Sequence, residues 1–564
     1  MDFKLQIADL LNSKFKDFSK EEIISMIEIP PNPEMGDYAF PCFRLAKIFR
    51  KSPAQIAEDT VKVIEKPDFI KEIKNVSGYI NFYIDKTKFA FYVLSEVLDK
   101  KETYGSSNEG NGKNIVIDYS APNIAKPFHV GHLRSTVIGG SIYRIFKKLG
   151  YNCIGVNHLG DWGTQFGKLI VAYKKWGSKE AVEKDGIKEL MRIYVLFHEK
   201  AEKDPSLEEE ARKWFTKMEN GDKEALDLWN WFKDISLIEF NKVYDLLGIK
   251  FDSYAGESFY NDKMDKVIEE LEQKGLLKES EGAKIVELED MPPCLITKKD
   301  GSTLYATRDI TAAIYRKNTY DFNKCIYVTA LAQNLHFAQW FKVIEKMGYD
   351  WYKDLIHVPF GLVSMETGKL STRKGNVVLL EEILKEAIEK TKQIINDKNP
   401  NLENKDIIAE QVGIGAVIFN DLSNNRIKDV VFSWDKVLNF DGETGPYVQY
   451  THARACSVLR KANINIDKEK IDYSILTDPA SVEVIRLMEQ FPEKIKEAAN
   501  KLEPSFIARY IIDLSQAFNK FYHDNPILVE DEKVKIARLA LVYGVKTILY
   551  IGLDLLGIKA PEKM

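Results

Sequence analysis

The feature that most constrains this chain is a strand-loop-helix-strand pattern between residues 114 and 156. The β-branched run "NIVIDYS" (114–120) predicts a buried strand, and "YNCIGV" (151–156) predicts a second one. Apolar residues recur at helical spacing between them: Leu133, Val137, Ile142, Ile145 and Leu149. A helix that connects two such strands predicts a right-handed crossover between parallel strands, and therefore an α/β fold.

The loop before this helix carries the first chemical pattern, "SAPNIAKPFHVGHLRST" (120–136). Ligands bind at the carboxyl ends of parallel strands, and a helix N-terminus there suits an anion. His129 and His132 can donate hydrogen bonds to phosphate oxygens, and Gly131 leaves room for a flat base. Two other interpretations stay open at this point. The histidines fit a helix cap with a packing residue, or a metal pair, although no third ligand has suitable spacing.

A second chemical pattern is the short cationic stretch "GKLSTRKGN" (368–376), which follows a predicted strand. Its small hydroxyl residues and its cations predict a loop that closes over a phosphate chain, and a solvated basic turn is the alternative. Together the two stretches favour one site for displacement at a nucleotide α-phosphate, with Mg²⁺ sharing the charge neutralisation.

Composition bounds the class of protein. A length of 564 residues predicts about three or four domains. The chain is 45% hydrophobic and 29% charged, as in soluble globular proteins, and we find no run of about 18 apolar residues. The acidic, helical N-terminus does not resemble a signal peptide. Five scattered cysteines predict reduced thiols, a cytoplasmic protein and no structural zinc. A net charge of −5 means that any nucleic-acid surface is a local patch.

Pattern changes along the chain predict three parts. Residues 1–95 read as a small α+β module, followed by a polar, glycine-rich linker at 100–114. Residues 110–390 read as the α/β domain, with a helical insertion at about 166–285. The sheet is expected to resume at 301–316 and 324–331. Residues 405–564 show a nearly all-helical pattern.

Longer strings resemble a known family. "HVGH" and "KLSTR" resemble the HIGH and KMSKS motifs of class I aminoacyl-tRNA synthetases. The strings "HLGDWGTQFG" (158–167), "GETGPYVQYTHARACSVLRKA" (442–462) and "LGIKAPEKM" resemble arginyl-tRNA synthetases, and the resemblance covers essentially the whole chain. It implies a Rossmann-like catalytic domain, an N-terminal additional domain that touches the tRNA elbow, and a C-terminal helical anticodon-binding domain.

The same resemblance implies the reaction. L-Arginine and ATP would give arginyl-adenylate and pyrophosphate, and the arginyl group would then pass to the 3′ end of tRNA(Arg). The first step would need tRNA, and the enzyme would be a monomer.

By the resemblance, the catalytic residues are His129, His132, Lys126 and Lys374. The ATP-binding residues are Pro122, Asn123, His129, Gly131, His132, Lys369, Ser371, Thr372 and Arg373. The second lysine of KMSKS falls on Thr372, which is a departure from the family pattern. We therefore expect the loop charge to come first from Lys126 and second from Lys374, with Arg373 as the remaining candidate.

The arginine pocket implied by the resemblance consists of Asp118, Asn123, His132, Tyr305, Asp309 and Gln333. Carboxylates and amides are suitable partners for a guanidinium, which presents a planar fork of donors. Tyr305 and Asp309 are spaced i, i+4, so they share one face of a helical turn. A pocket of this kind rejects analogues that lack the fork by roughly 10⁴-fold, so no separate editing domain is expected. Asp161 and Gln165 are expected to support the site floor.

The tRNA contacts implied by the resemblance are Tyr79, Asn81, Arg454 and Arg460. Ser77 stands where the family often has asparagine, which is a second departure. Helical periodicity alone predicts that Tyr447 and Tyr450 are core residues.

Two other functions remain open from the sequence. One is a small-molecule nucleotidyltransferase or ligase built on the same HxGH fold, which would leave both terminal parts unexplained. The other is a non-catalytic tRNA-binding protein, against which the intact histidines and pocket carboxylates argue. Pyrophosphate exchange with each amino acid, with and without tRNA, separates the three functions.

Overall fold

A four-stranded parallel sheet lies at the centre of the computed structural model, which describes residues 3–126, 128–299, 303–365 and 379–564. Its strands are β4 (Asn114–Asp118), β5 (Asn152–Val156), β9 (Lys324–Ala330) and β10 (Leu355–Phe360), in the order β10-β9-β4-β5. The helix α6 (Val130–Lys148) joins β4 to β5, so the predicted strand-helix-strand unit is confirmed.

The strand order places a crevice at the carboxyl ends of β4 and β9. From β4 the chain moves to β5 on one side, and β9 later pairs on the other side. Ligands of open α/β sheets bind where the order reverses in this way. β4 is apolar and buried at Ile115, Val116 and Ile117, as expected for a parallel strand covered on both faces.

The sheet does not resume at 301–316, where the sequence predicted it. Residues Tyr305–Tyr320 form the helix α13, and Thr303 makes only an isolated bridge to Thr297. Ala306, Ile310 and Ala313 bury one face of this helix. Alanine favours helix, and this face outweighs the threonines and isoleucines that suggested a strand. The helix α14 (Asn334–Lys346) then connects β9 to β10.

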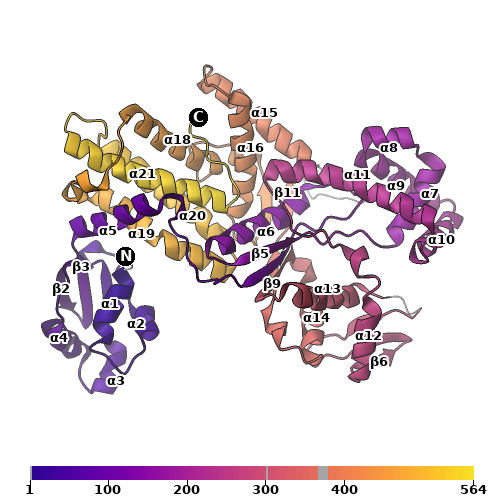
Figure 1. Cartoon of the computed structure of the whole chain (residues 1–564), viewed down its shortest axis with the longest axis horizontal. Helices are drawn as coiled ribbons and strands as arrows, with labels where there is room; N and C mark the ends of the chain where they lie inside the picture. Colours follow the sequence, from indigo (N-terminus) through magenta and orange to yellow (C-terminus); the bar gives the residue numbers. More distant parts are fainter. Residues whose placement is uncertain (1–2, 127, 300–302, 366–378) are drawn as a thin grey trace.

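The insertion is only partly helical. Its helices are α7 (Thr164–Trp176), α8 (Lys179–Asp185), α9 (Ile187–Ala201), α10 (Ser206–Glu219) and α11 (Lys223–Leu247). After α12 (Met264–Gln273), an antiparallel sheet follows: β6 (Leu277–Ser280), β7 (Ala283–Val286) and β8 (Cys294–Thr297). The expectation of a helical segment up to residue 285 is therefore wrong for β6 and β7. Figure 1 shows α7 to α10 at one end of the molecule, away from β6.

The N-terminal module contains an antiparallel sheet of order β1-β3-β2, as expected for an α+β unit. Its elements are α1 (Phe3–Asn12), α2 (Lys20–Met26), β1 (Tyr38–Pro41), α3 (Ala46–Phe49), α4 (Pro53–Val63), β2 (Ile70–Val76) and β3 (Tyr79–Ile84). The helix α5 (Lys86–Lys100) leads from this module to the C-terminal helices, which it contacts through a hydrogen bond between Ser95 and Tyr473.

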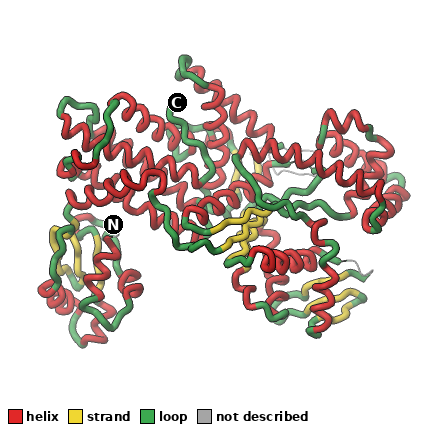
Figure 2. Tube along the Cα trace, in the orientation of Figure 1, coloured by secondary structure: helices red, strands yellow, loops and turns green. Residues whose placement is uncertain are grey.

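The C-terminal part is a bundle of helices (Figures 1 and 2). They are α15 (Leu380–Lys398), α16 (Lys405–Leu422), α17 (Trp434–Val437), α18 (Gly445–Ala462), α19 (Pro479–Lys501), α20 (Ser505–Asp524) and α21 (Glu532–Leu555). One strand interrupts the helical pattern: β12 (Val430–Phe432) pairs in parallel with β11 (Val363–Met365). Among the described residues, α21 is long and apolar enough to cross a membrane by length and composition alone, and 72% of its apolar window is buried inside the protein.

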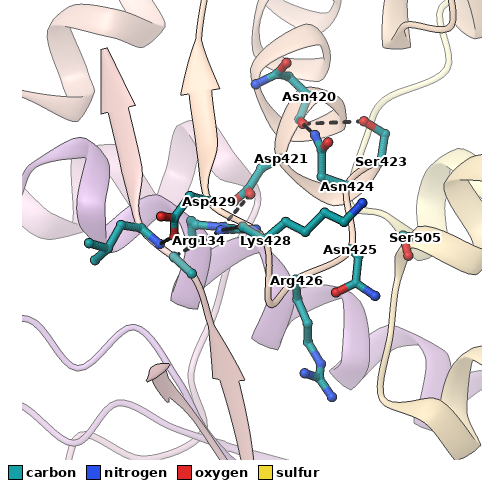
Figure 3. A network of polar contacts seen from close by, with 12 residues as sticks. Arg134, Asn420, Asp421, Ser423, Asn424, Asn425, Arg426, Lys428, Asp429 and Ser505 are labelled. Carbon is teal, nitrogen blue, oxygen red and sulfur yellow. Dashed lines mark hydrogen bonds and ion pairs between the residues drawn. The ribbon is translucent and has the colours of Figure 1, made fainter. Parts of the chain in front are cut away.

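Buried polar contacts fasten α6 to the C-terminal helices. Arg134 Nε lies 2.7 Å from Asp421 Oδ1 of α16, and the two side chains are 1% and 4% exposed (Figure 3). Arg134 Nη1 also donates to the carbonyl oxygens of Gly361 and Lys428. Farther along α6, Ser141 donates to the carbonyl oxygen of Leu555 in α21. The helix that begins with the histidine pair is thus held by both halves of the chain.

Candidate functional site

The two histidines cap the helix that they begin. His129 Nδ1 accepts the N–H of Gly131 at 3.0 Å, and His132 Nδ1 accepts the N–H of His129 at 3.2 Å. The ring centroids are 4.0 Å apart, and the ring of Phe128 stacks on His132. A Cβ at Gly131 would lie 2.7 Å from His129 Cε1, so glycine is needed for this cap. The helix-cap interpretation is therefore correct, and it leaves the outer nitrogen of each ring free for another role.

Both imidazoles are neutral at physiological pH. Burial is the main cause that lowers the pKa of His132 to about 3, and the neighbouring His129 and Lys126 also disfavour its charged form. The pKa of His129 is lowered by burial and by Lys126. Because each Nδ1 accepts a backbone N–H, the ring proton is on Nε2. The helix N-terminus thus presents two Nε2–H donors beside the cation of Lys126.

The loop between β4 and α6 has an unusual backbone. Ser120, Ala121 and Ala125 adopt positive φ angles of 72°, 45° and 58°, which residues other than glycine rarely adopt. Such conformations persist where the surroundings hold them, and they cluster at functional sites. Here α11 supplies the support, because Ala125 donates its N–H to Ser236 Oγ and Tyr244 bonds the hydroxyl of Ser120. The helical insertion therefore helps to shape the loop.

A second loop, after β5, lies beside the first. Asn123 forms a parallel bridge with Gly160, whose N–H donates to the carbonyl oxygen of Pro122. Asp161 is fully buried and binds Lys233 Nζ at 2.6 Å, together with the N–H and hydroxyl of Ser258. Asp161 thus joins α11 to the segment before α12. Gln165 makes a contact of 3.4 Å with the carbonyl oxygen of Trp162.

Two acidic residues of the expected pocket lie on different elements. Asp118 ends β4 and is 6% exposed, and Asp309 lies on α13. Asp309 Oδ2 is 2.5 Å from His336 Nε2 of α14. His158 lies near both acids: burial lowers its pKa, while Asp118 and Asp309 oppose that shift. Asp118 and Asp309 therefore both lie in the neighbourhood of His158.

Asp118 is also connected to the histidine helix. Two residues after it, the N–H of Ser120 donates to Ser135 Oγ, and the Ser120 hydroxyl bonds that of Thr136. Thr136 in turn donates to the carbonyl oxygen of His132. The acidic pocket and the two Nε2–H donors therefore occupy one end of the sheet.

A third carboxyl group, Glu257, lies near the pocket and was not singled out from the sequence. Burial raises its pKa to about 7; Arg308, 3.9 Å away, lowers it, and Asp309 and Asp161 raise it. At neutral pH this group is poised between its two charge states, unlike an exposed glutamate.

The remaining expected pocket residues are exposed. Tyr305 is 65% exposed and begins α13 one turn before Asp309. Gln333 is exposed just before α14, three residues ahead of His336. Asn123 and Lys126 are exposed in the loop before α6, where Pro122 is buried. Tyr305 and Gln333 thus border Asp309, while Asn123 borders the histidines.

The cationic stretch cannot be placed in the same way. Lys369, Ser371, Thr372, Arg373 and Lys374 lie outside the described residues. The residue that follows this range, Leu379, forms an antiparallel bridge with His129, and the N–H of Leu380 donates to the carbonyl oxygen of Phe128. Leu379, the first described residue after the stretch, therefore lies beside the histidine pair.

The residues expected to contact tRNA lie in both terminal parts. Tyr79 is half-buried and packs edge-on against Phe43, which is 50% exposed. Asn81, on the same strand, is only 2% exposed, which is at odds with a direct contact through its side chain. β3 is the central strand of its sheet, and burial does not alternate along it: Ile80, Asn81 and Phe82 are all buried.

In the C-terminal part, Arg454 and Arg460 line one cavity of about 620 Å³. The guanidinium carbon of Arg454 lies 4.9 Å from the ring centroid of Tyr450 and 5.5 Å from that of Tyr522. Tyr450 is 42% exposed, so the core assignment from periodicity is wrong for this residue. Tyr447 is half-buried and bonds Asn519, in keeping with that assignment.

No group of three or more His, Cys, Asp or Glu side chains gathers as a metal site within the described part of the chain. The five cysteines are buried and unpaired.

Sequence reasoning missed several groups near this site: the buried Arg316 and the partly buried His158, Glu257 and His336. No spacing in the sequence distinguishes these residues from ordinary helix or loop residues. Only His158 had a signal, since it begins the string "HLGDWGTQFG".

Comparisons with known proteins agree with this geometry. Family models match residues 2–84 (arginyl tRNA synthetase N terminal domain), 93–434 (tRNA synthetases class I (R), catalytic domain) and 448–564 (DALR anticodon binding domain). The chain is 62% identical to the arginine–tRNA ligase of Alkaliphilus metalliredigens and 60% identical to that of Clostridioides difficile, in each case over 100% of both chains.

Solved structures show the same fold. The Plasmodium falciparum arginyl-tRNA synthetase superposes with a TM-score of 0.81 at 29% identity, covering 100% of this chain and 98% of that one. The Thermus thermophilus enzyme gives 0.83 at 24% identity over 100% of both chains. This chain has a histidine-capped helix at the switch point of a parallel sheet, an N-terminal module and a C-terminal helical bundle. It belongs to the arginyl-tRNA synthetase family of class I aminoacyl-tRNA synthetases.

Proposed function

We propose that this chain activates L-arginine with ATP and transfers the arginyl group to the 3′ end of tRNA(Arg). The observation that carries the proposal is the convergence of Asp118 and Asp309 around His158, at the same end of the sheet as His129 and His132. An acidic pocket beside a helix N-terminus with two N–H donors suits a cationic amino acid and a nucleotide together.

In the first step, the arginine carboxylate attacks the α-phosphorus of ATP and pyrophosphate leaves. Negative charge builds on the phosphate oxygens as the new bond forms. Neutral His129 and His132 donate Nε2–H bonds to those oxygens, while Lys126 supplies positive charge. Pro122, Asn123 and Gly131 would line the nucleotide.

The cationic stretch is the other partner of the phosphates in this proposal. Lys374 would add a second catalytic cation, and Lys369, Ser371, Thr372 and Arg373 would contact ATP. The bridge between Leu379 and His129 supports this arrangement, because Leu379 is the first described residue after that stretch.

Mg²⁺ would accompany ATP. This ion is commonly held by substrate phosphates with only one or two protein carboxylates, so a site without a dedicated ligand cluster among the described residues suits it. When bound, it would neutralise phosphate charge. The proposal includes no structural zinc.

For arginine recognition, we assign the substrate guanidinium to Asp309 and the exposed Tyr305, with Gln333 beside them. Asp118, Asn123 and His132 lie nearer the nucleotide end and suit the α-amino and carboxylate groups. This assignment predicts that lysine is rejected. The single ammonium group of lysine would leave some of the acceptors that bind the guanidinium unpaired.

Recognition of tRNA would involve both terminal parts. Tyr79 with Phe43 offers an exposed aromatic pair for the tRNA elbow, and Asn81 would support it from below. Arg454 and Arg460, with the exposed rings of Tyr450 and Tyr522, form a cationic and aromatic cavity suited to unpaired bases.

We further propose the domain division 1–95, 110–390 and 405–564, with the insertion at about 166–285. The proposal also includes a monomeric, cytoplasmic enzyme with no membrane contact, whose first step depends on tRNA.

The test is pyrophosphate exchange with each amino acid, with and without tRNA(Arg). Exchange with arginine alone among the amino acids, and only when tRNA is present, is the expected result. Exchange without any amino acid would instead identify a small-molecule nucleotidyltransferase, and no exchange at all would identify a non-catalytic binder.

A further inference from the structure

A cavity of about 740 Å³ lies along the last turns of α6, whereas the histidine pair begins that helix. Its other walls are the linker at Ser106 and Ser107, the segment that follows α11, and the end of α21. None of its lining residues belongs to the proposed ATP, arginine or tRNA contacts. The cavity is therefore separate from the site described above.

Positive charge dominates the lining of this cavity. Four cations line it: Arg144, Lys147, Lys148 and Lys250. The acids of the lining are Asp252 and Asp554, and Asp252 Oδ2 already accepts the N–H of Gly155 at 2.7 Å. In the part of the chain that the structure describes, no carboxylate oxygen lies within 4.0 Å of the charged nitrogens of these four cations. The lining thus carries two more positive than negative side chains.

Arg144 is held in the cavity wall by two other segments of the chain. Its Nη2 donates to the carbonyl oxygen of Gly248, at the end of α11, over 2.8 Å. A Cβ at Gly557, after α21, would lie 2.8 Å from Arg144 Nη1, so glycine leaves room there for the guanidinium. A guanidinium has five N–H donors, and the contact with Gly248 uses one of them. The other donors are available to a ligand.

Helix ends are the alternative partners of these cations, because a helix C-terminus carries a partial negative charge. Arg144 meets α11 in this way, and Lys148 Nζ donates to the carbonyl oxygen of Glu102 at 2.6 Å. Burial nevertheless lowers the pKa of Arg144 and of Lys148, although Asp554 opposes both shifts. The carbonyl groups and acids present therefore do not replace the water that these two cations lose.

A hydroxyl group without a partner lies in the same lining. Ser107 Oγ is buried and has no hydrogen-bond partner among the described residues. The N–H of Ser107 donates to the carbonyl oxygen of Lys148, so the linker lies against the end of α6. A buried hydroxyl left unpaired costs free energy. Guanidinium, ammonium and hydroxyl donors together are the groups that proteins use to bind phosphate oxygens.

We propose that this cavity binds a phosphate-bearing anion through Arg144, Lys148 and the Ser107 hydroxyl, with the exposed Lys147 and Lys250 at its rim. Its volume lies within the range of small-molecule sites, so it admits a chain of several phosphates. The recognition chemistry is the same for a free polyphosphate, such as that of a nucleotide, and for consecutive phosphates of a tRNA backbone. The inference does not depend on the proposed function.

The test is hydrogen exchange of the full chain with inorganic tripolyphosphate as the probe, without Mg²⁺ and at constant ionic strength. Tripolyphosphate is expected to slow exchange in residues 104–112 and 246–253, which border the cavity. Arg144→Gln is expected to raise the half-saturating concentration at least about tenfold, as for loss of a charged hydrogen bond. Lys147→Gln/Lys250→Gln is expected to raise it about three- to tenfold, because both side chains are exposed.

The matched control is Arg212→Gln/Lys266→Gln, which also removes two positive charges. These residues lie on α10 and α12, away from α21 in Figure 1, and we expect the half-saturating concentration to stay unchanged. Exchange in residues 128–133 reports on the proposed ATP site, and any slowing there should be the same with and without Arg144→Gln. Failure of the proposed ATP site would therefore appear in residues 128–133 alone.

The inference is overturned if tripolyphosphate does not slow exchange at the cavity, if Arg144→Gln leaves the half-saturating concentration unchanged, or if the control double variant shifts it equally. If Arg144→Gln does not fold, an unchanged concentration in Lys147→Gln/Lys250→Gln overturns it. ATP and tRNA(Arg), each in place of tripolyphosphate, identify the source. Slowing at the cavity by ATP alone indicates a free nucleotide. Slowing by tRNA, with a salt slope reduced by about one for each phosphate contact removed, indicates the tRNA backbone.

Discussion

Replacement of Arg134 by methionine is predicted to destabilise the junction between α6 and α16 in a pH-dependent way. The guanidinium lies 2.7 Å from Asp421, and both side chains are almost completely buried. Burial raises the pKa of Asp421, and Arg134 opposes that rise. Without Arg134, the carboxylate remains buried with no counter-charge, and its lowest-energy response is to bind a proton.

The magnitude follows from that response. Protonation at pH 7 of a carboxyl whose unfolded pKa is about 3.9 costs about three pKa units, or about 4 kcal/mol, which agrees with about 3–5 kcal/mol for breaking a buried pair. At pH 5 the same protonation costs about 1.5 kcal/mol. Above about pH 4, Asp421 binds this proton in the folded variant but not in the unfolded chain. The stability of the variant is therefore highest below about pH 4 and falls as the pH rises.

The assay is chemical denaturation at pH 5 and pH 7, with hydrogen exchange of α6 and α16 amides because a chain of several domains does not unfold in one step. The variants are Arg134→Met, Asp421→Leu and the double variant. The double variant is expected to recover most of the loss, since an apolar pair can replace a buried ion pair. Equal destabilisation at the two pH values, or a double variant as unstable as Arg134→Met, would refute the reasoning.

Three further outcomes are expected. His132 stays neutral at pH 6 because burial lowers its pKa to about 3, so stability falls as the pH drops from 6.5 toward 3; ring ¹⁵N shifts of a charged imidazole at pH 6 would contradict this. Gly131→Ala forces the His129 ring off the helix end, which should cost about 1 kcal/mol and slow pyrophosphate exchange at least about tenfold; wild-type exchange would show that the cap is dispensable. Ser236→Ala leaves the Ala125 N–H buried without its acceptor, at about 1–3 kcal/mol, and should speed hydrogen exchange at Ala125; unchanged protection there would count against α11 as the support of the loop.

The central unit of the fold could be predicted because its signals are local. The β-branched run before Ser120 and the helical spacing after Gly131 each report on a few consecutive residues, and both elements formed as expected. The error at 301–316 has the same origin. A segment with threonine and isoleucine fits either period, and packing against β8 and β4 decided for α13.

The buried partners of the site could not be predicted because they depend on distant elements. Arg316 reads as an ordinary residue of an amphipathic helix, and only the pairing of β4 with β9 brings it to Asp118. His336 similarly reaches Asp309 from α14. The exposure of Tyr450 and the burial of Asn81 depend on how neighbouring elements cover them, which periodicity does not report.

The contacts of α6 with the C-terminal bundle bear on how such an enzyme can evolve. Arg134 and Ser141 contact Asp421 and Leu555, so the helix that begins with the histidine pair rests partly on the part that carries the proposed anticodon cavity. Exchange of that bundle with another synthetase would replace Asp421 and the end of α21 in the same event. We therefore expect such chimeras to hold α6, and with it the proposed ATP site, less firmly. The contacts of Arg134 with Asp421 and of Ser141 with Leu555 would have to be kept to avoid this.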